Sequence, residues 1–325
     1  MAPAWDTHAD DMPFIDIKDL TVRLGSKVAL QGVTFSLDAR AVGLLGPNGA
    51  GKSTLIRTIL GFHVPERGRC LVLGHDVATQ GREVRSLIGY MPENDSFIAG
   101  MTAIRFVRYM AELHGLPPAD AMERAHESLF WVGLGEARYR KVETFSVGMK
   151  QRVKLAQAIV HGPRLVLLDE PTNGLDPPGR KHMLDLVRQL QAHHDVCVIL
   201  SSHLLRDVEA CSDHVLILRD GRLIDSSDVR ADRASRRRFV ELEVIGDRSA
   251  FTKALDAHGI EHASGRRDAG VKLVLPPEAS SAMLFQAAET SGAVIRRMVQ
   301  RRDTLEDKFL RAMGQDLGES SLAGP

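Results

Sequence analysis

An alternation of apolar and polar residues runs through residues 14–38 and is clearest at 33–38, which read VTFSLD. Such a two-residue period predicts strands that bury one face. An apolar run at 42–45 then leads through a glycine-rich stretch into residues 55–60, whose apolar positions have helical spacing. The first part of the chain is therefore expected to form several strands and then a strand–loop–helix unit.

Helical spacing returns between residues 102 and 132, with a break at residues 116–118. The apolar residues of each expected helix share one face: Ile104, Val107 and Ala111 in the first, and Met122, Ala125 and Leu129 in the second. Residues 147–161 have helical character as well. The apolar runs at 165–169 and 196–200 are continuous, which is typical of strands in a parallel sheet covered on both faces.

The last part of the chain has its own order of elements. We expect a strand at 240–244, a helix at 249–258, strands at 261–265 and 271–275, a helix at 278–291, a strand at 293–299 and a helix at 304–313. This order is typical of a small ferredoxin-like α+β domain. The domains are therefore expected at 13–230 and 239–315, joined by an arginine-rich linker at 231–238 and flanked by disordered tails at 1–12 and 316–325.

Composition limits the class of protein. The 325 residues include 42 Lys and Arg and 42 Asp and Glu, so the formal net charge is zero and no nucleic-acid partner is expected. The arginines of the linker have no aromatic residues between them, which favours a solvated surface over an RNA-binding patch. No run approaches the ~20 apolar residues of a membrane span, no secretory signal begins the chain, and the three cysteines are far apart. We expect a cytoplasmic protein.

The most informative motif is the run at residues 46–54, GPNGAGKST, which fits the pattern G-x-x-x-x-G-K-[ST]. Its glycines allow a tight loop whose N–H groups point at phosphate oxygens, helped by the positive end of the following helix. Lys52 is expected to reach the β- and γ-phosphates, and the Ser53 hydroxyl to bind Mg²⁺. The residues expected to hold a nucleoside triphosphate are Gly46, Pro47, Asn48, Gly49, Ala50, Gly51, Lys52, Ser53 and Thr54.

An acidic pair supplies the rest of the expected chemistry, because hydrolysis needs a further Mg²⁺ ligand and a group that activates water. Asp169 ends the apolar run at 165–169, at the carboxyl edge where ligands of open α/β sheets bind. Glu170 follows directly and is placed to act as general base. Acidic pairs at strand ends are common, so this assignment depends on the surrounding motifs.

Three further runs, in this order, resemble the ATP-binding subunits of ABC transporters. They are FSVGMKQR at 145–152, DEPTNGLDP at 169–177 and SSH at 201–203. With the phosphate loop they extend the resemblance over residues 14–230. Within that family the chain is most similar to stand-alone ATPases that serve type-2 export permeases. The resemblance implies an α/β fold of the P-loop NTPase class with an antiparallel β subdomain and a helical subdomain.

The resemblance also implies how the residues work. His203 would contact the γ-phosphate and hold Glu170 and the attacking water. The signature residues, expected to act on the nucleotide of a second subunit, are Ser146, Val147, Gly148 and Met149. The residues expected at the dimer interface are Gly174, Leu175 and Asp176. One signature and one phosphate loop per chain imply a head-to-tail pair, either a homodimer or a dimer with a related ATPase.

The same resemblance implies an ATPase that uses ATP and Mg²⁺ and drives a separate transmembrane permease. The permease is expected to be of the type-2 family and the transport to be export. The chain would then lie on the cytoplasmic face of the cell membrane, as a peripheral subunit.

Three features, at four positions, depart from the family pattern. Glu93 stands where the family usually has Gln. Its carboxylate is expected to be a further Mg²⁺ ligand, and it adds negative charge near the phosphates. Leu24 stands where an aromatic residue usually stacks on adenine, so Leu24 and Val28 are expected to cover the base, with weaker and less selective binding. Val147 and Met149 replace the commoner Gly and Gln, but both contact positions of the signature are kept.

Two other functions are open at this point. A soluble ABC-type ATPase acting on ribosomes or DNA usually carries two ATPase domains or a long coiled coil, whereas this chain has one ATPase unit and no heptad run. A catalytically weak regulatory protein is suggested by Leu24 and Glu93. The presence of Lys52, Glu170 and His203 argues against that interpretation.

Overall fold

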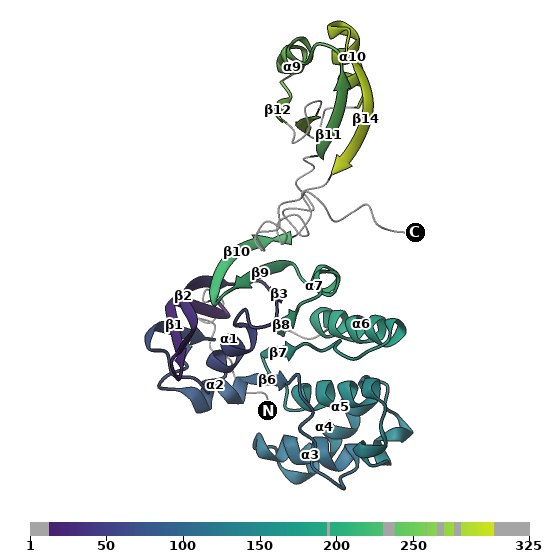
Figure 1. Ribbon diagram of the computed structural model, residues 1–325. Helices are drawn as coiled ribbons and strands as arrows, with labels where there is room; N and C mark the ends of the chain where they lie inside the picture. The colour runs from purple at the N-terminus through teal and green to yellow at the C-terminus, as the bar shows by residue number, and fades with distance from the viewer. Residues whose placement is uncertain are drawn as a thin grey trace. The chain divides into compact units, whose positions relative to one another are not determined.

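The chain forms two compact units, one ending at Asp228 and the other beginning at Val229, in a computed structural model (Figure 1). The structure describes residues 13–193, 196–229, 238–257, 259–264, 270–275 and 281–301. The expected tails, most of the expected linker and the expected helix at 304–313 lie outside these residues. None of the described helices combines the length and the apolar character that crossing a bilayer requires.

The alternating segment near the N-terminus forms an antiparallel sheet with the strand order β2-β1-β4-β5. Its strands are β1 (Ile15–Leu24), β2 (Lys27–Leu37), β4 (Arg67–Val72) and β5 (His75–Asp76). β1 and β2 pair with Ile17 opposite Phe35, and both side chains are buried. The two-residue period predicted from the sequence is therefore the period of the buried face.

The second sheet has six strands in the order β10-β9-β3-β8-β7-β6. They are β3 (Ala41–Leu45), β6 (Ile88–Met91), β7 (Leu165–Asp169), β8 (Cys197–Ser202), β9 (His214–Arg219) and β10 (Arg222–Asp228). The pairs from β9 to β6 are parallel, and β10 closes the edge as an antiparallel hairpin. Every residue of β3, β7 and β8 is buried, as the continuous apolar runs predict.

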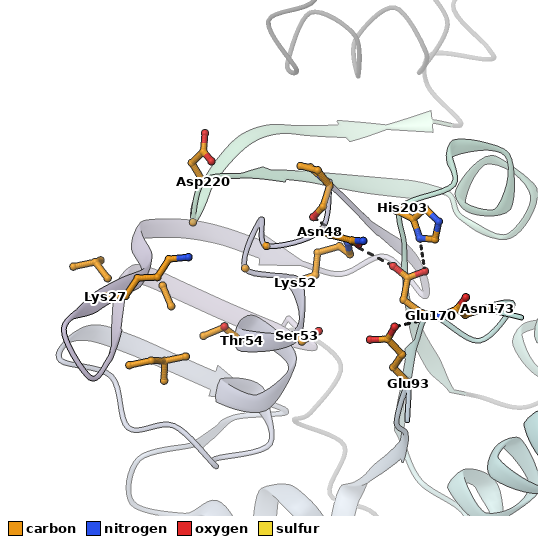
Figure 2. Close-up of a pocket in the computed structure, with 17 residues that line it drawn as sticks. Lys27, Asn48, Lys52, Ser53, Thr54, Glu93, Glu170, Asn173, His203 and Asp220 are labelled. Carbon is orange, nitrogen blue, oxygen red and sulfur yellow. Dashed lines mark hydrogen bonds and ion pairs between the residues drawn. The ribbon is translucent and has the colours of Figure 1, made fainter. Parts of the chain in front are cut away.

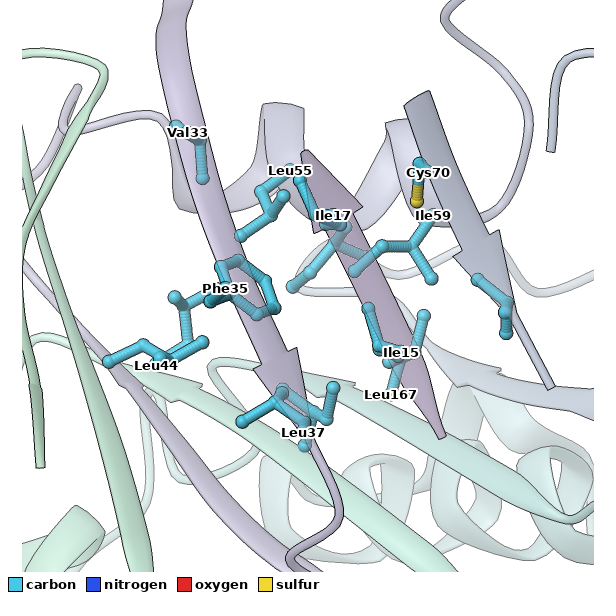
Figure 3. Close-up of a cluster of buried hydrophobic side chains, with 14 of the residues drawn as sticks. Ile15, Ile17, Val33, Phe35, Leu37, Leu44, Leu55, Ile59, Cys70 and Leu167 are labelled. Carbon is cyan, nitrogen blue, oxygen red and sulfur yellow. The ribbon is translucent and has the colours of Figure 1, made fainter. Parts of the chain in front are cut away.

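Helix α1 (Lys52–Ile59) contributes to the core that joins the two sheets. Figure 3 shows Leu55 of α1 and Leu44 of β3 among side chains of the antiparallel sheet. This packing fixes the start of α1, and with it the preceding loop, against both sheets. Helix α2 (Gly81–Leu87) follows the antiparallel sheet and contributes Val84 to the same core.

A group of helices forms the lower part of the first unit in Figure 1. It comprises α3 (Ala103–Leu113), α4 (Pro118–Trp131), the short 3-10 turns η1 (Glu136–Tyr139) and η2 (Val142–Thr144), and α5 (Val147–Ile159). α5 is tied to the strand β6 and the segment that follows it. Gln157 donates to the carbonyl oxygen of Tyr90 at 2.6 Å, and Lys154 to that of Glu93 at 2.7 Å.

One helix follows the acidic pair, and another follows the histidine. α6 (Pro177–His193) begins shortly after β7, and α7 (Leu205–Cys211) begins two residues after His203. α7 packs closely on β3, since a Cβ added to Gly43 would lie 2.2 Å from Cγ1 of Val208. Neither helix was predicted from the apolar spacing.

The second unit contains the strands β11 (Arg238–Ile245), β12 (Glu261–Ser264), β13 (Gly270–Leu275) and β14 (Val294–Arg301) and the helices α9 (Arg248–Ala257) and α10 (Ser281–Ser291). The strands are antiparallel in the order β12-β13-β11-β14. Alternate residues of β11 and β13 pack with Phe251 and Leu284 of the helices in a separate core. The β-α-β-β-α-β order supports the ferredoxin-like assignment, which stays a prediction.

Candidate nucleotide-binding site

The loop between β3 and α1 turns at two glycines with positive φ. Gly49 has a φ of 81°, and Gly51, the N-cap of α1, has a φ of 105°. A Cβ on Gly51 would also lie 2.9 Å from Cδ2 of Leu30 and 3.1 Å from the carbonyl oxygen of Ala29, so this position needs glycine for two reasons. No side chain caps α1 and its first turn holds no acidic residue. The positive end of the helix is therefore directed at the loop.

Lys52 is buried at the start of α1, and its ammonium group reaches back along the loop. Nζ donates to the carbonyl oxygens of Gly46 at 2.6 Å and Pro47 at 3.3 Å. It also lies 3.5 Å from Oε1 of Glu170, and both side chains are 7% exposed. The fold thus brings the cation of the phosphate loop next to the carboxylate of Glu170, which directly follows β7.

Ser201 fixes both members of the acidic pair. It lies beside Asp169 in the ladder between β7 and β8, and its Oγ donates to Oδ1 of Asp169 at 2.5 Å. The N–H of Glu170 donates to Oγ of Ser201 at 3.1 Å and to its carbonyl oxygen at 3.2 Å. Glu170 has a φ of 49°, in the left-handed region that a residue other than glycine rarely adopts.

The Glu170 carboxylate lies between Lys52 and His203 (Figure 2). Its Oε2 is 2.9 Å from Nδ1 of His203, a distance at which an Nδ1–H donates to the carboxylate. Its Oε1 is buried and accepts no hydrogen bond from the residues that the structure describes. A carboxylate oriented through one oxygen, with the other facing an ammonium group in a pocket, is placed to accept a proton from a water molecule.

These groups lie at one end of a pocket of about 710 Å³. Its lining residues are Leu24, Lys27, Val28, Ala29, Pro47, Asn48, Gly49, Gly51, Lys52, Ser53, Thr54, Glu93, Glu170, Asn173, His203, Asp220 and Gly221. Lys27 and Asp220 lie at the end away from Glu170 (Figure 2). Leu24 and Val28 also line the pocket, and none of its described lining residues is Phe, Tyr or Trp. Its volume is within the roughly 300–1,000 Å³ of small-molecule sites.

The signature residues do not line this pocket. Ser146 is the N-cap of α5, and its Oγ accepts a hydrogen bond from the N–H of Met149 at 3.3 Å. The loop at 174–176 lies beside the signature, because a Cβ added to Gly174 would be 3.3 Å from Cγ1 of Val147. Val147 is 52% exposed. The signature and this loop therefore form one partly exposed surface outside the pocket of their own chain.

Comparisons with known proteins decide the family. A family model described as ABC transporter matches residues 30–173. The bacitracin transport ATP-binding protein of Bacillus licheniformis is 31% identical over 301 residues, which cover 92% of this chain and 97% of that protein. The chain belongs to the ABC transporter ATP-binding proteins. It is accordingly an ATP-binding and ATP-hydrolysing subunit of such a transporter.

Two further relatives of this ABC transporter ATP-binding protein extend the comparison. The daunorubicin resistance ATP-binding protein of Streptomyces coeruleorubidus is 31% identical over 298 residues, which cover 90% of this chain and 94% of that protein. A solved structure of an ATP binding subunit of an ABC transporter matches with a TM-score of 0.60 and 32% identity, over 68% of this chain and 92% of the other. The second of these confirms the expected ATPase fold of the first unit.

Some groups in the site of this ABC ATPase were not expected from its sequence. Asn173 lines the pocket and donates from Nδ2 to Oε1 of Glu93 at 3.2 Å. Asn173 and Ser201 stand inside two recognised runs, but no role was assigned to either. Lys27 and Asp220 carry no motif, and only the packing of β2 against the β9–β10 hairpin brings them to the pocket. The one signal in the sequence is that Lys27 directly precedes Val28, which was expected to cover the base.

Proposed function

We propose that this ABC ATPase is the motor subunit of an exporter and works as a head-to-tail pair that closes on two ATP molecules. The observation that carries this proposal is the composition of the pocket. Lys52, Glu170 and His203 line it, whereas Ser146 and Gly148 of the same chain do not. A second subunit, presenting the surface formed by its signature and its loop at 174–176, would complete each site.

The chain's own residues supply the chemistry of hydrolysis. Lys52 and the N–H groups of the loop hold the β- and γ-phosphates. Glu170 takes a proton from the attacking water while the water oxygen bonds to the γ-phosphorus. The bond between the γ-phosphorus and the β–γ bridging oxygen breaks, and this oxygen leaves with ADP, so that the products are ADP and phosphate. His203 keeps the Glu170 carboxylate in place. Leu24 and Val28 cover the base without a stacking ring, so ATP binding is expected to be weaker than with an aromatic platform.

The oxygen donors at the pocket fit Mg²⁺. Ser53 and Glu93 line the pocket, and Asp169, which is buried and does not line it, directly precedes Glu170. Their hydroxyl and carboxylate oxygens are the hard ligands that this ion prefers. The described residues contain no group of three or more His, Cys, Asp or Glu side chains able to hold a metal ion by themselves, so phosphate and water oxygens would complete the coordination. Mg²⁺ held by these residues would offset the negative charge that develops on the phosphates in the transition state.

Replacing Glu93 by Gln is expected to raise the Mg²⁺ concentration needed for half-maximal ATPase activity by about two- to five-fold and to lower KM for ATP. The change removes a metal ligand and also a negative charge near the phosphates, and because Glu93 is exposed both effects are screened by salt. Titrations of the steady-state rate with Mg²⁺ and, at saturating Mg²⁺, with ATP measure the two quantities. Glu127→Gln is the control, since Glu127 pairs with Arg124 at 2.9 Å on the helix α4 and does not line the pocket. Unchanged Mg²⁺ dependence in Glu93→Gln would remove Glu93 from the metal site.

The exporter role is supported by the relatives whose names concern bacitracin transport and daunorubicin resistance. The similarity to both covers more than nine tenths of those proteins and includes the second unit. A separate permease, of the type-2 family, would supply the transmembrane path, and the chain would bind it peripherally at the cytoplasmic face. The alternative, a soluble ABC-type ATPase acting on ribosomes or DNA, has no such support among these relatives.

Purification of the tagged full-length chain from its own cells tests the exporter proposal. We expect a protein with about six apolar spans of ~20 residues to co-purify from membranes solubilised in mild detergent. We also expect reconstitution with that protein to raise the ATPase rate several-fold. The same preparation with Glu170→Gln serves as control, because it should retain the membrane partner without turnover. Sedimentation with ribosomes, and no membrane partner, would favour the alternative function.

A further inference from the structure

The backbone of Glu170 must be held in a conformation that it would not adopt by itself. Its φ of 49° lies in the left-handed region, which destabilises a residue that carries a Cβ. Ser201 binds the N–H of Glu170 from one side. On the other side the chain continues through a tight turn, in which the N–H of Asn173 donates to the carbonyl oxygen of Glu170 at 3.0 Å. The position of Glu170 therefore depends on what anchors this turn.

Thr172 is the anchor of the turn. Its side chain is buried, and Oγ1 donates to Oδ2 of Asp207 at 2.5 Å. The carbonyl oxygen of Thr172 accepts a hydrogen bond from the N–H of Leu175 at 3.2 Å, so the same residue also holds the start of the loop at 174–176. Asp207 is 2% exposed. A buried carboxylate is costly unless it is hydrogen-bonded, so this contact is strongly specified.

Asp207 belongs to α7, the helix that follows His203, and α7 is itself fixed. Val208, the next residue, packs against Gly43 in β3, the strand that leads into the phosphate loop. Asp207 also lies 3.9 Å from Nε of Arg180, which is in the first turns of α6. The Asp207 carboxylate thus connects α7 to the segment after β7 and to the start of α6, while Val208 packs α7 against β3.

We propose that Asp207 is a positioning residue for hydrolysis, which acts through Thr172 to hold Glu170 in its left-handed conformation. It touches neither the pocket nor the reacting atoms, since neither Asp207 nor Thr172 lines the pocket. The inference rests on the proposed role of Glu170 as general base. The inference predicts that loss of the Thr172–Asp207 hydrogen bond displaces the Glu170 carboxylate. The groups that hold ATP, which lie on the loop between β3 and α1, should stay in place.

Thr172→Val tests the inference, because valine keeps the shape of threonine and removes only the donor. We expect kcat for ATP hydrolysis by the full-length chain to fall about ten- to hundred-fold, the usual effect of a small misplacement of a catalytic group. KM for ATP should change less than about two-fold, because Lys52 and the loop are unaltered. Thr172→Ser retains the hydroxyl and should recover at least half of the wild-type kcat.

Asp207→Ala should lower kcat as Thr172→Val does. The double variant should be no slower than the slower single variant, since each change removes the same Thr172–Asp207 hydrogen bond. Ser212→Ala is the matched control: Ser212 is a buried residue at the C-cap of α7, and its Oγ has no hydrogen-bond partner among the described residues. It should keep the wild-type kcat. Wild-type kcat in Thr172→Val, additive losses in the double variant, or failure of Thr172→Ser to recover would overturn the inference.

Two further measurements separate the possible failures. A purely structural role would lower Tm and nucleotide binding together, so both are measured for every variant, and a loss of ATP affinity parallel to the loss of kcat counts against positioning. Glu170→Gln is run beside these variants. If Glu170→Gln retains turnover, the proposed base is wrong; if it abolishes turnover while Thr172→Val is normal, only the role of Asp207 is wrong.

Discussion

Glu170→Gln is expected to abolish ATP turnover, by at least about 10²-fold, while ATP binding remains intact. Glutamine keeps the size of the side chain but cannot accept a proton from water at neutral pH. It also removes the negative charge that lies 3.5 Å from Nζ of Lys52, which leaves the ammonium group available for phosphate. Steady-state phosphate release and equilibrium binding of a fluorescent ATP analogue measure the two quantities separately.

The same variant should accumulate as an ATP-bound dimer, because ATP binding closes the proposed pair and only hydrolysis opens it. Size-exclusion chromatography with light scattering, with and without Mg²⁺ and ATP, measures this directly. Glu127→Gln is a suitable control, since Glu127 pairs with Arg124 at 2.9 Å on the helix α4 and does not line the pocket. Hydrolysis at a near wild-type rate by Glu170→Gln would show that another group activates the water.

A mixture of two inactive variants should recover activity if the pair is head to tail. Lys52→Met disables the phosphate loop and Ser146→Arg disables the signature, so either variant alone is expected to lose at least about 10²-fold in rate. In a mixed dimer both defects meet in one site, and the other site combines an intact loop with an intact signature. Random pairing makes half of the dimers mixed, and each has one intact site of two, so about a quarter of the wild-type rate should return.

The matched control for this experiment mixes Lys52→Met with Glu170→Gln. Both residues line the same pocket within one chain, so each mixed dimer carries one defect in each of its two sites. No activity should return. Recovery in the control, or none with Ser146→Arg, would mean that the signature does not act on the nucleotide of the opposite subunit.

The contiguous parts of the site could be predicted from the sequence. The loop at 46–54 has a fixed chemistry because Gly49 and Gly51 adopt positive φ and Lys52 begins a helix, and these properties depend on neighbours along the chain. The continuous apolar run that ends in Asp169 similarly specifies a buried strand with an acidic pair at its carboxyl end. In both cases the local pattern and the required geometry coincide.

Helix α6 shows where local patterns are insufficient. It begins with Pro177-Pro178-Gly179, which read alone are typical of a turn. In the structure Asp176 caps this helix, because its Oδ1 accepts a hydrogen bond from the N–H of Gly179 at 3.1 Å, and Pro177 occupies the first helical position, where its missing N–H has no consequence. Only the packing of the helix after this start distinguishes it from a loop.

The sequence by itself determined that the chain binds a nucleoside triphosphate, that its ATPase unit is α/β, and that Lys52, Glu170 and His203 are the groups to examine. The tertiary structure decided how these groups meet. The strand order β3-β8-β7 places Ser201 beside Asp169 and His203 beside Glu170, and α7 carries Asp207 to Thr172. These contacts join residues that are more than thirty positions apart, and such contacts follow from which strands and helices become neighbours, not from the local period of apolar residues.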